Sequence, residues 1–237
     1  MLPVIEQATI LAHTTLPGNY TQLRVLAPTI ARAAQPGHFC HALSTCRLYV
    51  MRLDAQAGWI DFLYQTESPE FGALADYAKN VLLDIEGPFG NAFNLEDAHP
   101  TLIIGEKLGL APLVFLCQRL MAHANTRPSL FLLGDDGPFP FIPKPSLFIV
   151  PVPAGVIACM PLMEDWKIPS RLANQQSLPG CYEGSVIELA RDWLEKQHEY
   201  GSEKSVIFAC GSTALVAQVS ELSARFNLAS PQTVTLN

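Results

Sequence analysis

The hydrophobic pattern of this 237-residue chain changes character near residue 97. Before that point, short runs of β-branched and aromatic residues are separated by turn pairs such as Pro17-Gly18 and Pro36-Gly37, a pattern typical of small antiparallel sheets. After it, continuous apolar runs alternate with segments of helical periodicity, as in strands buried on both faces of a parallel sheet. We therefore expect two domains, residues 1–97 and residues 98–237.

The first domain has the pattern of a small antiparallel β-barrel. Several short strands at close spacing, with proline and glycine between them, favour a closed sheet of this kind. The expected strands are residues 8–12, 20–26, 39–43, 47–53, 59–64 and 81–86, with one short helix at residues 71–79.

The second domain has the pattern of repeated strand–helix units, which predicts parallel strands with helices on the faces of the sheet. The expected strands are residues 101–104, 129–133, 205–209 and 232–236, and the expected helices are residues 111–124, 183–198 and 213–226. Six prolines between Pro138 and Pro153 interrupt this pattern. Proline fixes φ and lacks a backbone donor, so we expect extended loop there, with a strand near residues 147–150.

Composition excludes several classes of partner. The chain has 15 lysines and arginines against 22 acidic residues, a net charge of −7, which disfavours nucleic acid and anionic membrane surfaces. It has no apolar run of roughly 18 residues and no signal-peptide pattern at its start, so we expect a cytoplasmic protein without a membrane span. Its six cysteines form no Cys-x-x-Cys pair and are expected to be reduced thiols. In His38-Phe39-Cys40-His41 the side chains alternate along a strand, so no metal site is expected.

Two glycine-containing stretches are candidate ligand loops. Residues 87–93, Gly-Pro-Phe-Gly-Asn-Ala-Phe, are either a linker between domains or a ligand contact. Residues 105–112, Gly-Glu-Lys-Leu-Gly-Leu-Ala-Pro, lead from a buried strand into a helix. Backbone N–H groups at a helix start can receive a pyrophosphate, although Glu106 places a carboxylate there.

Together these stretches resemble the ferredoxin-reductase-type flavoproteins, and most closely the electron-transfer subunit of two-subunit dihydroorotate dehydrogenases. Pro36-Gly37-His38-Phe39 is similar to a Pro-Gly-Gln-Phe motif of that family. Arg47-Leu48-Tyr49-Val50 lies where the family has an Arg-x-x-Ser/Thr motif at the flavin ring and phosphate. Tyr64-Gln65 lies where it has a Tyr-Arg pair near the flavin.

The resemblance continues through both glycine loops. Residues 87–93 are similar to Gly-Pro-Leu-Gly-Asn-Gly-Phe, and residues 105–112 to the Gly-Gly-Gly-x-Gly-x-Ala-Pro loop that serves the nicotinamide nucleotide. Cys210-Gly211 is similar to a Cys-Gly-Pro turn beside the nicotinamide.

The resemblance implies a Greek-key flavin-type barrel, followed by a nucleotide-binding-type parallel α/β domain. It also implies a flavin-dependent oxidoreductase that moves electrons between a nicotinamide nucleotide and a partner protein, with FAD and NAD(P) as cofactors. The expected partners are a catalytic subunit and a second copy of the chain. No catalytic residue or metal ligand is assigned. The residues implied to bind cofactor are Arg47, Tyr49, Val50, Tyr64, Gln65, Gly87, Asn91, Gly105, Gly109, Cys210 and Gly211.

Several departures from the family leave a second interpretation open. Ser68-Pro69-Glu70-Phe71 replaces the Gly-x-Gly-Thr loop of the FAD pyrophosphate and brings in an acid, which repels phosphate. Val50 removes a hydroxyl, Glu106-Lys107 replaces two glycines, and Ser212 replaces the turn proline. The sequence ends at Asn237, before the family's cysteine cluster, so no iron–sulfur cluster is expected. The alternative is a cofactor-depleted homologue that acts as a binding or regulatory partner subunit.

Overall fold

The computed structural model describes residues 3–67, 71–75, 77–95, 101–124, 128–199 and 205–236. It divides into two compact units. One unit is Met1–Phe93 with Ala111–Gln118, and the other is Asn94–Leu110 with Arg119–Asn237. No helix within the described ranges is long and apolar enough to cross a membrane.

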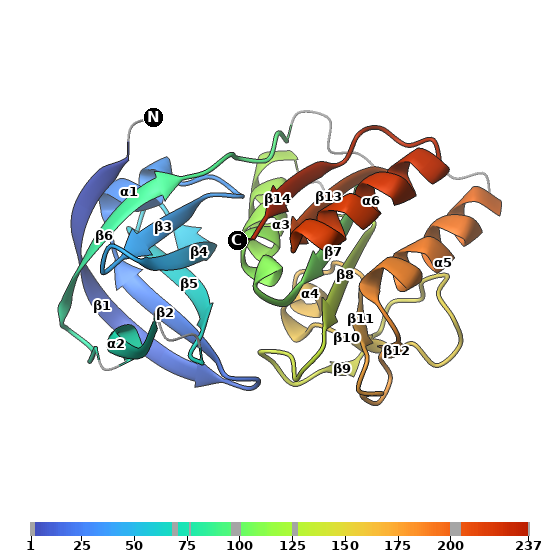
Figure 1. Cartoon of the computed structure of the whole chain (residues 1–237), viewed down its shortest axis with the longest axis horizontal. Coiled ribbons are helices and arrows are strands. Elements are labelled where there is room, and N and C mark those ends of the chain that lie inside the picture. The colour runs from blue at the N-terminus through green and yellow to red at the C-terminus, as the bar shows by residue number, and fades with distance from the viewer. Residues whose placement is uncertain are drawn as a thin grey trace. The chain divides into compact units, whose positions relative to one another are not determined.

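The first unit is a closed six-stranded barrel in the order β1-β2-β5-β4-β3-β6, and every neighbouring pair is antiparallel (Figure 1). The chain goes from β2 to β3, returns through the hairpins β3–β4 and β4–β5, and places β5 beside β2 and β3 beside β6. This is a Greek-key arrangement, which confirms the expected fold. Pairing of β1 with β6 closes the sheet, so the barrel has no open edge. The strands are β1 (Val4–Leu16), β2 (Tyr20–Leu26), β3 (Phe39–Ala42), β4 (Cys46–Asp54), β5 (Trp59–Gln65) and β6 (Leu82–Phe89).

Side chains on β3 and β4 alternate between the barrel interior and its outer wall, as the period of a strand requires. Cys40, Leu48 and Val50 belong to the buried core cluster. Their neighbours Phe39 and Tyr49 are a register pair on the other face of these strands. This alternation places the candidate residues of β4 on two different faces.

Two short helices accompany the barrel. Helix α1 (Pro28–Ala33) starts with proline, and the Glu6 carboxylate accepts hydrogen bonds from Thr29 N and Ile30 N at 3.0 and 2.9 Å. It was not predicted. The helix expected over residues 71–79 is shorter in the structure, where α2 covers Gly72–Ala75.

The second unit is a six-stranded parallel sheet in the order β12-β11-β8-β7-β13-β14. From β7 the chain first adds strands on one side and then returns to add β13 on the other. The order of strands therefore reverses between β7 and β13. The strands are β7 (Thr101–Glu106), β8 (Leu130–Asp135), β11 (Ser170–Asn174), β12 (Tyr182–Glu183), β13 (Val206–Gly211) and β14 (Gln232–Thr235).

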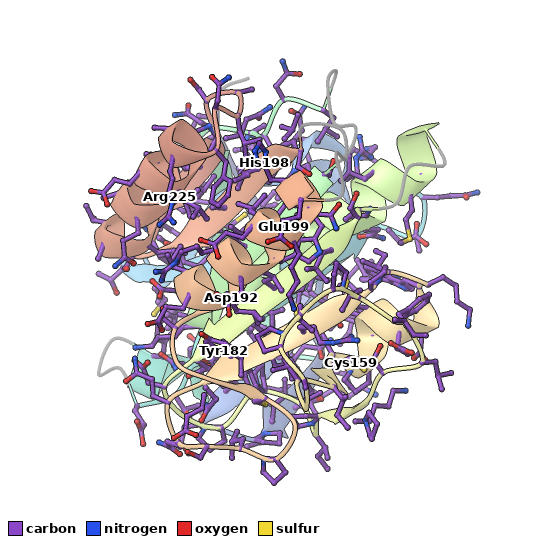
Figure 2. All side chains as sticks on the ribbon, turned by 90° about the vertical axis from the view of Figure 1, so that its right-hand side faces the viewer. Cys159, Tyr182, Asp192, His198, Glu199 and Arg225 are labelled. Carbon is purple, nitrogen blue, oxygen red and sulfur yellow. The ribbon has the colours of Figure 1, made fainter. Side chains whose placement is uncertain are left out.

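Three longer helices follow the strands: α3 (Leu110–Ala124), α5 (Val186–Glu199) and α6 (Thr213–Arg225). Apolar residues of α5 and α6, such as Trp193 and Val219, share one buried cluster with Ile104 and Leu132 of the sheet. Figure 2 looks onto this part of the molecule, with Asp192, His198 and Glu199 labelled on α5 and Arg225 on α6. Arg225 pairs with Glu195 of α5 at 3.0 Å.

The prediction of a strand near residues 147–150 is wrong. The proline-rich segment has only β9 (Lys144–Pro145), paired with β10 (Ala158–Cys159), and it is followed by the unpredicted helix α4 (Pro161–Asp165). Side chains bond the segment's backbone in place of a neighbouring strand. Arg171 donates to Phe148 O at 2.7 Å, and Glu164 accepts from Leu147 N at 2.6 Å.

Candidate functional site

Arg47 and Tyr49 lie two residues apart on β4, on the face that points away from the barrel core, where Arg47 is half-buried and Tyr49 is buried. Their register partners on β3 are His41 and Phe39. The guanidinium carbon of Arg47 lies 4.4 Å from the centre of the Phe39 ring, and the Phe39 and Tyr49 ring centres are 6.0 Å apart. A cation therefore lies on an aromatic surface, an arrangement that favours both partners.

Phe89 at the end of β6 extends the same surface. Its ring stacks on Phe39 with centres 5.8 Å apart and lies 5.0 Å from the ring of His41. Gly90 follows with a φ of +91°, and a Cβ atom there would lie 3.2 Å from the Phe39 ring. The turn after β6 therefore packs on the aromatic surface, while Asn91 beyond it is exposed. We call Phe39, His41, Arg47, Tyr49 and Phe89 the barrel wall.

Arg47 makes no ion pair within the part of the chain that the structure describes. It is half-buried. By contrast, Arg24 and Arg52 both pair with Asp61, at 2.7 and 3.0 Å. The barrel wall therefore offers a positive charge to an anionic group.

Two of the residues implied to bind flavin do not lie on the wall. Val50 belongs to the barrel core. Leu63 is the register partner of Tyr49, so the next residue, Tyr64, points to the opposite face. Tyr64 is fully buried, and its hydroxyl lies 2.5 Å from His13 Nε2. This burial raises the pKa of Tyr64 to about 12.

The remaining barrel candidates lie at strand ends and turns. Gln65 ends β5 opposite Tyr20 and is partly exposed. Gly87 packs tightly, because a Cβ atom there would lie 2.6 Å from Cys40 Sγ. Residues 68–70, where the pyrophosphate loop was expected, lie outside the described residues.

In the second unit, Glu106 ends β7 next to the end of β13. Its Oε1 accepts a hydrogen bond from Ser212 N at 2.7 Å. Ser212 is the N-cap of α6, and its Oγ accepts from Leu215 N at 3.1 Å. The Glu106 carboxylate therefore lies at the N-terminus of this 13-residue helix.

Gly105, Gly109 and Cys210 are all buried and closely packed in this region. A Cβ atom on Gly109 would lie 2.1 Å from the carbonyl oxygen of Cys210, so only glycine allows this approach. Cys210 is fully buried, which raises the pKa of its thiol. Gly105 is buried in β7, where it pairs with Cys210. Burial keeps this thiol protonated and unreactive.

Lys107 takes an unusual backbone conformation in the same loop. Its φ is +49°, which costs energy for any residue with a Cβ atom. Its Nζ lies 2.6 Å from Asp136 Oδ2, and this bond raises the pKa of Lys107. Lys107 and Asp136 lie far apart in the sequence, so no local pattern predicts this ion pair.

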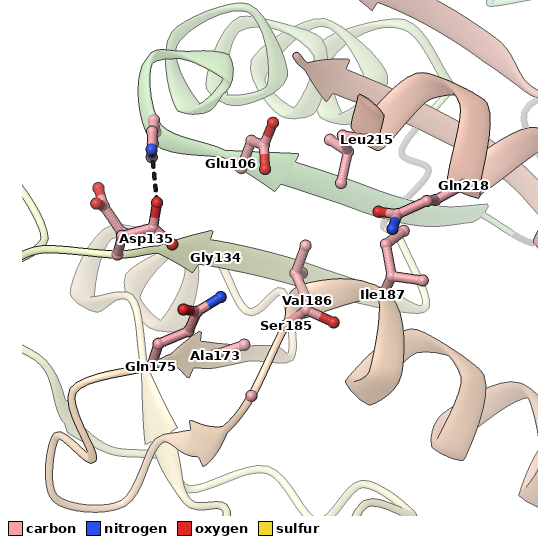
Figure 3. A pocket seen from close by; sticks show the side chains of 13 residues that line it. Glu106, Gly134, Asp135, Ala173, Gln175, Ser185, Val186, Ile187, Leu215 and Gln218 are labelled. Atoms are coloured by element: carbon pink, nitrogen blue, oxygen red, sulfur yellow. Dashed lines mark ion pairs between the residues drawn. The ribbon is translucent and has the colours of Figure 1, made fainter. Parts of the chain in front are cut away.

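A cavity of about 70 Å³ lies at the carboxyl ends of these strands. Figure 3 shows Glu106 and Leu215 along one wall and Ala173 and Gln175 along the other, with the Lys107–Asp136 ion pair as a dashed line. Binding pockets for small molecules are roughly 300–1,000 Å³. The cavity is thus too small for a dinucleotide.

Part of the chain is similar in sequence to known electron-transfer proteins. No family model matches the chain. An electron transfer subunit of dihydroorotate dehydrogenase B (NAD(+)) from Geobacillus sp. (strain WCH70) is 26% identical over 127 residues, which cover 49% of each chain. The reductase component of propane 2-monooxygenase from Mycolicibacterium smegmatis is 27% identical over 156 residues, covering 62% of this chain and 40% of that protein. The matched part spans about half the length of these curated relatives or less.

Solved structures match nearly the whole chain. The ferredoxin reductase of carbazole 1,9a-dioxygenase has a TM-score of 0.71 at 13% identity, over 99% of this chain and 70% of that one. Phthalate dioxygenase reductase, described as transferring electrons from pyridine nucleotides to a 2Fe-2S centre, has a TM-score of 0.67 at 11% identity, over 98% of this chain and 68% of that one. The TM-scores show that these proteins share the fold of this chain, and at such low sequence identity they show the fold alone.

Proposed function

We propose that this chain, which resembles the ferredoxin-reductase-type flavoproteins in sequence and shares their fold, is a flavin-dependent electron-transfer subunit that works with a partner protein. The matched sequences include an electron transfer subunit and a reductase component, and both are named as parts of larger enzymes. One solved neighbour, a flavohemoglobin, is described with bound FAD, and it covers the whole of this chain at a TM-score of 0.66.

The barrel wall is the observation that supports FAD as the cofactor. FAD combines a flat aromatic ring with a diphosphate, so its site needs an aromatic surface and a cation. Arg47 supplies a half-buried cation with no carboxylate partner within the described residues, and Tyr49 and Phe39 supply rings beside it. A guanidinium suits phosphate because its donors form a planar fork.

The roles of the protein's own residues follow from this arrangement. Arg47 would hold a phosphate oxygen, while the ring of Tyr49, which is only 4% exposed, would pack beside the cofactor as part of the surface that supports it. Phe39 and Phe89 stack on each other and fix the surface behind Arg47. Bound FAD would supply the redox chemistry, while the protein orients it.

A second candidate function is a cofactor-depleted subunit that binds or regulates a partner. Two observations favour it. Tyr64, which was expected near the flavin, is buried against His13 and Phe71. Glu106, in the loop that was expected to receive a nucleotide phosphate, places its carboxylate at the start of α6.

Titration of the purified chain with FAD separates the two functions. A flavoprotein shows a perturbed visible spectrum on binding and a higher melting temperature, since a ligand at 100 times its dissociation constant adds about 2.7 kcal/mol. The bound flavin, reduced anaerobically with dithionite, should then reduce ferricyanide in a single turnover. A chain that leaves the FAD spectrum and its own melting temperature unchanged would exclude the flavin function and leave the second candidate.

A further inference from the structure

We infer that Glu106 takes the place of a ligand phosphate within the second unit and closes that unit to nicotinamide dinucleotides. The inference concerns the α/β unit alone and does not depend on the proposed flavin site.

The position of Glu106 is the one where an open parallel sheet binds its ligands. In such sheets the ligand lies beyond the carboxyl ends of the strands, at the point where the strand order reverses. Here that point lies between β7 and β13, because their neighbours β8 and β14 lie on opposite sides. Glu106 is the last residue of β7, and α6 starts directly after β13.

Two of the backbone donors that a phosphate could use at this point are already bonded within the chain. Ser212 N donates to Glu106 Oε1 at 2.7 Å, and Leu215 N donates to Ser212 Oγ at 3.1 Å. The partial positive charge of a helix N-terminus is roughly half an elementary charge, and one carboxylate already balances it. A diphosphate would have to displace this carboxylate or lie beside it against charge repulsion.

The side chain of Glu106 also packs tightly against Gly211. A Cβ atom on Gly211 would lie 2.7 Å from Glu106 Cγ and 2.9 Å from its Oε1. The missing side chain of Gly211 therefore makes room for the side chain of Glu106. At this position the glycine accommodates the protein's own carboxylate.

The side chain of Lys107 in the same loop is also engaged within the chain. Lys107 is paired with Asp136 at 2.6 Å, so its ammonium group already has an anionic partner. The cavity that remains, about 70 Å³, is lined by the acidic residues Glu106, Asp135 and Asp136 (Figure 3). Volume and charge both disfavour a dinucleotide. An electron donor for this chain would then be something other than a nicotinamide dinucleotide held by this unit.

Binding of NADH and NADPH to the purified chain tests the inference by isothermal titration calorimetry. The wild-type chain should bind both with a dissociation constant weaker than about 1 mM. Glu106→Gly combined with Lys107→Gly should bind at least one of them roughly tenfold more tightly, equal to about 1.4 kcal/mol. Glu195→Gln, which alters an acid on α5, is the matched control and should bind as the wild type does.

Glu106→Gln keeps the size of the side chain and an acceptor for Ser212 N, and it serves if the glycine variant does not fold. Removing its charge should give a smaller gain that shrinks as salt is added. Wild-type binding as tight as that of the variants would overturn the inference. A folded glycine variant that binds no better than the wild type would overturn it too. FAD titration of the same variants reports separately on the barrel wall.

Discussion

The carboxylate of Asp61 joins three strands of the barrel, and its removal tests the frame that carries Arg47 and Tyr49. Asp61 lies on β5 and is completely buried. Its Oδ1 accepts from Arg24 Nε of β2 at 2.7 Å, and its Oδ2 accepts from Arg24 Nη2 at 2.8 Å and Arg52 Nη2 of β4 at 3.0 Å. Asp61→Asn keeps the volume of the side chain but leaves two arginines without their anion.

The magnitude follows from burial. Breaking a buried ion pair by removing one partner costs about 3–5 kcal/mol. The side chains of Arg24 and Arg52 are 34% and 27% exposed, so water stabilises part of their charge after the change. We therefore expect a destabilisation at the lower end of this range, about 3 kcal/mol, which lowers the melting temperature of a unit of this size by about 12–24 °C.

Urea unfolding measures this loss, with Trp59 fluorescence as the reporter of the barrel. Trp59 lies on β5, and the Arg24 guanidinium carbon is 4.2 Å from its ring centre. Replacing Trp166 and Trp193 by phenylalanine makes the signal specific, which matters because the chain has two units. Asp84→Asn, an exposed acid on β6, is the control and should change stability by less than about 0.5 kcal/mol. An Asp61→Asn chain as stable as this control would refute the reasoning.

Two further predictions concern packing and pH. Gly109→Ala should destabilise the second unit by about 3–5 kcal/mol, because the new Cβ atom would lie 2.1 Å from the Cys210 carbonyl oxygen. Gly72→Ala is the control and should be nearly neutral, because no atom lies within 4 Å of a Cβ atom there. Urea unfolding of both variants measures the difference. Burial raises the pKa of Tyr64 from 10.0 to about 12, so the unfolded chain loses this proton first. Barrel stability should therefore be full below pH 10 and fall by about 2–3 kcal/mol as the pH rises to 12, a fall that Tyr64→Phe removes in urea titrations at each pH. An unchanged pH profile in Tyr64→Phe would contradict the assignment.

The fold could be predicted where local signals agree with one another. The sequence of β4 is rich in β-branched, aromatic and other apolar residues, and the turns on both sides contain glycine or polar residues, so strand and barrel were both expected. The prediction of a strand in the proline-rich segment failed, because the backbone of that segment is bonded by the side chains of Arg171 and Glu164. Both residues lie well after the segment in the sequence. No local pattern reveals bonds of that kind.

The candidate site was predictable only in part. Two-residue spacing places Arg47 and Tyr49 on one face of β4, and the same rule turns Val50 inward. The positions of Phe39 and Phe89 next to Arg47 and Tyr49 are set by the register between strands β3, β4 and β6, which the sequence does not show. The bond between Glu106 and Ser212 joins residues 106 positions apart.

We expect Arg47 on the barrel wall to hold the phosphate of FAD, which makes the FAD affinity of matched arginine variants the decisive measurement. Arg47→Ala removes the half-buried cation, while Arg32→Ala removes an exposed cation on α1 of the same unit. A charge-assisted hydrogen bond contributes about 1.5–3 kcal/mol. The dissociation constant of FAD should therefore rise roughly 10- to 100-fold in Arg47→Ala and stay unchanged in Arg32→Ala. Equal affinities in the wild type and both variants would contradict the account.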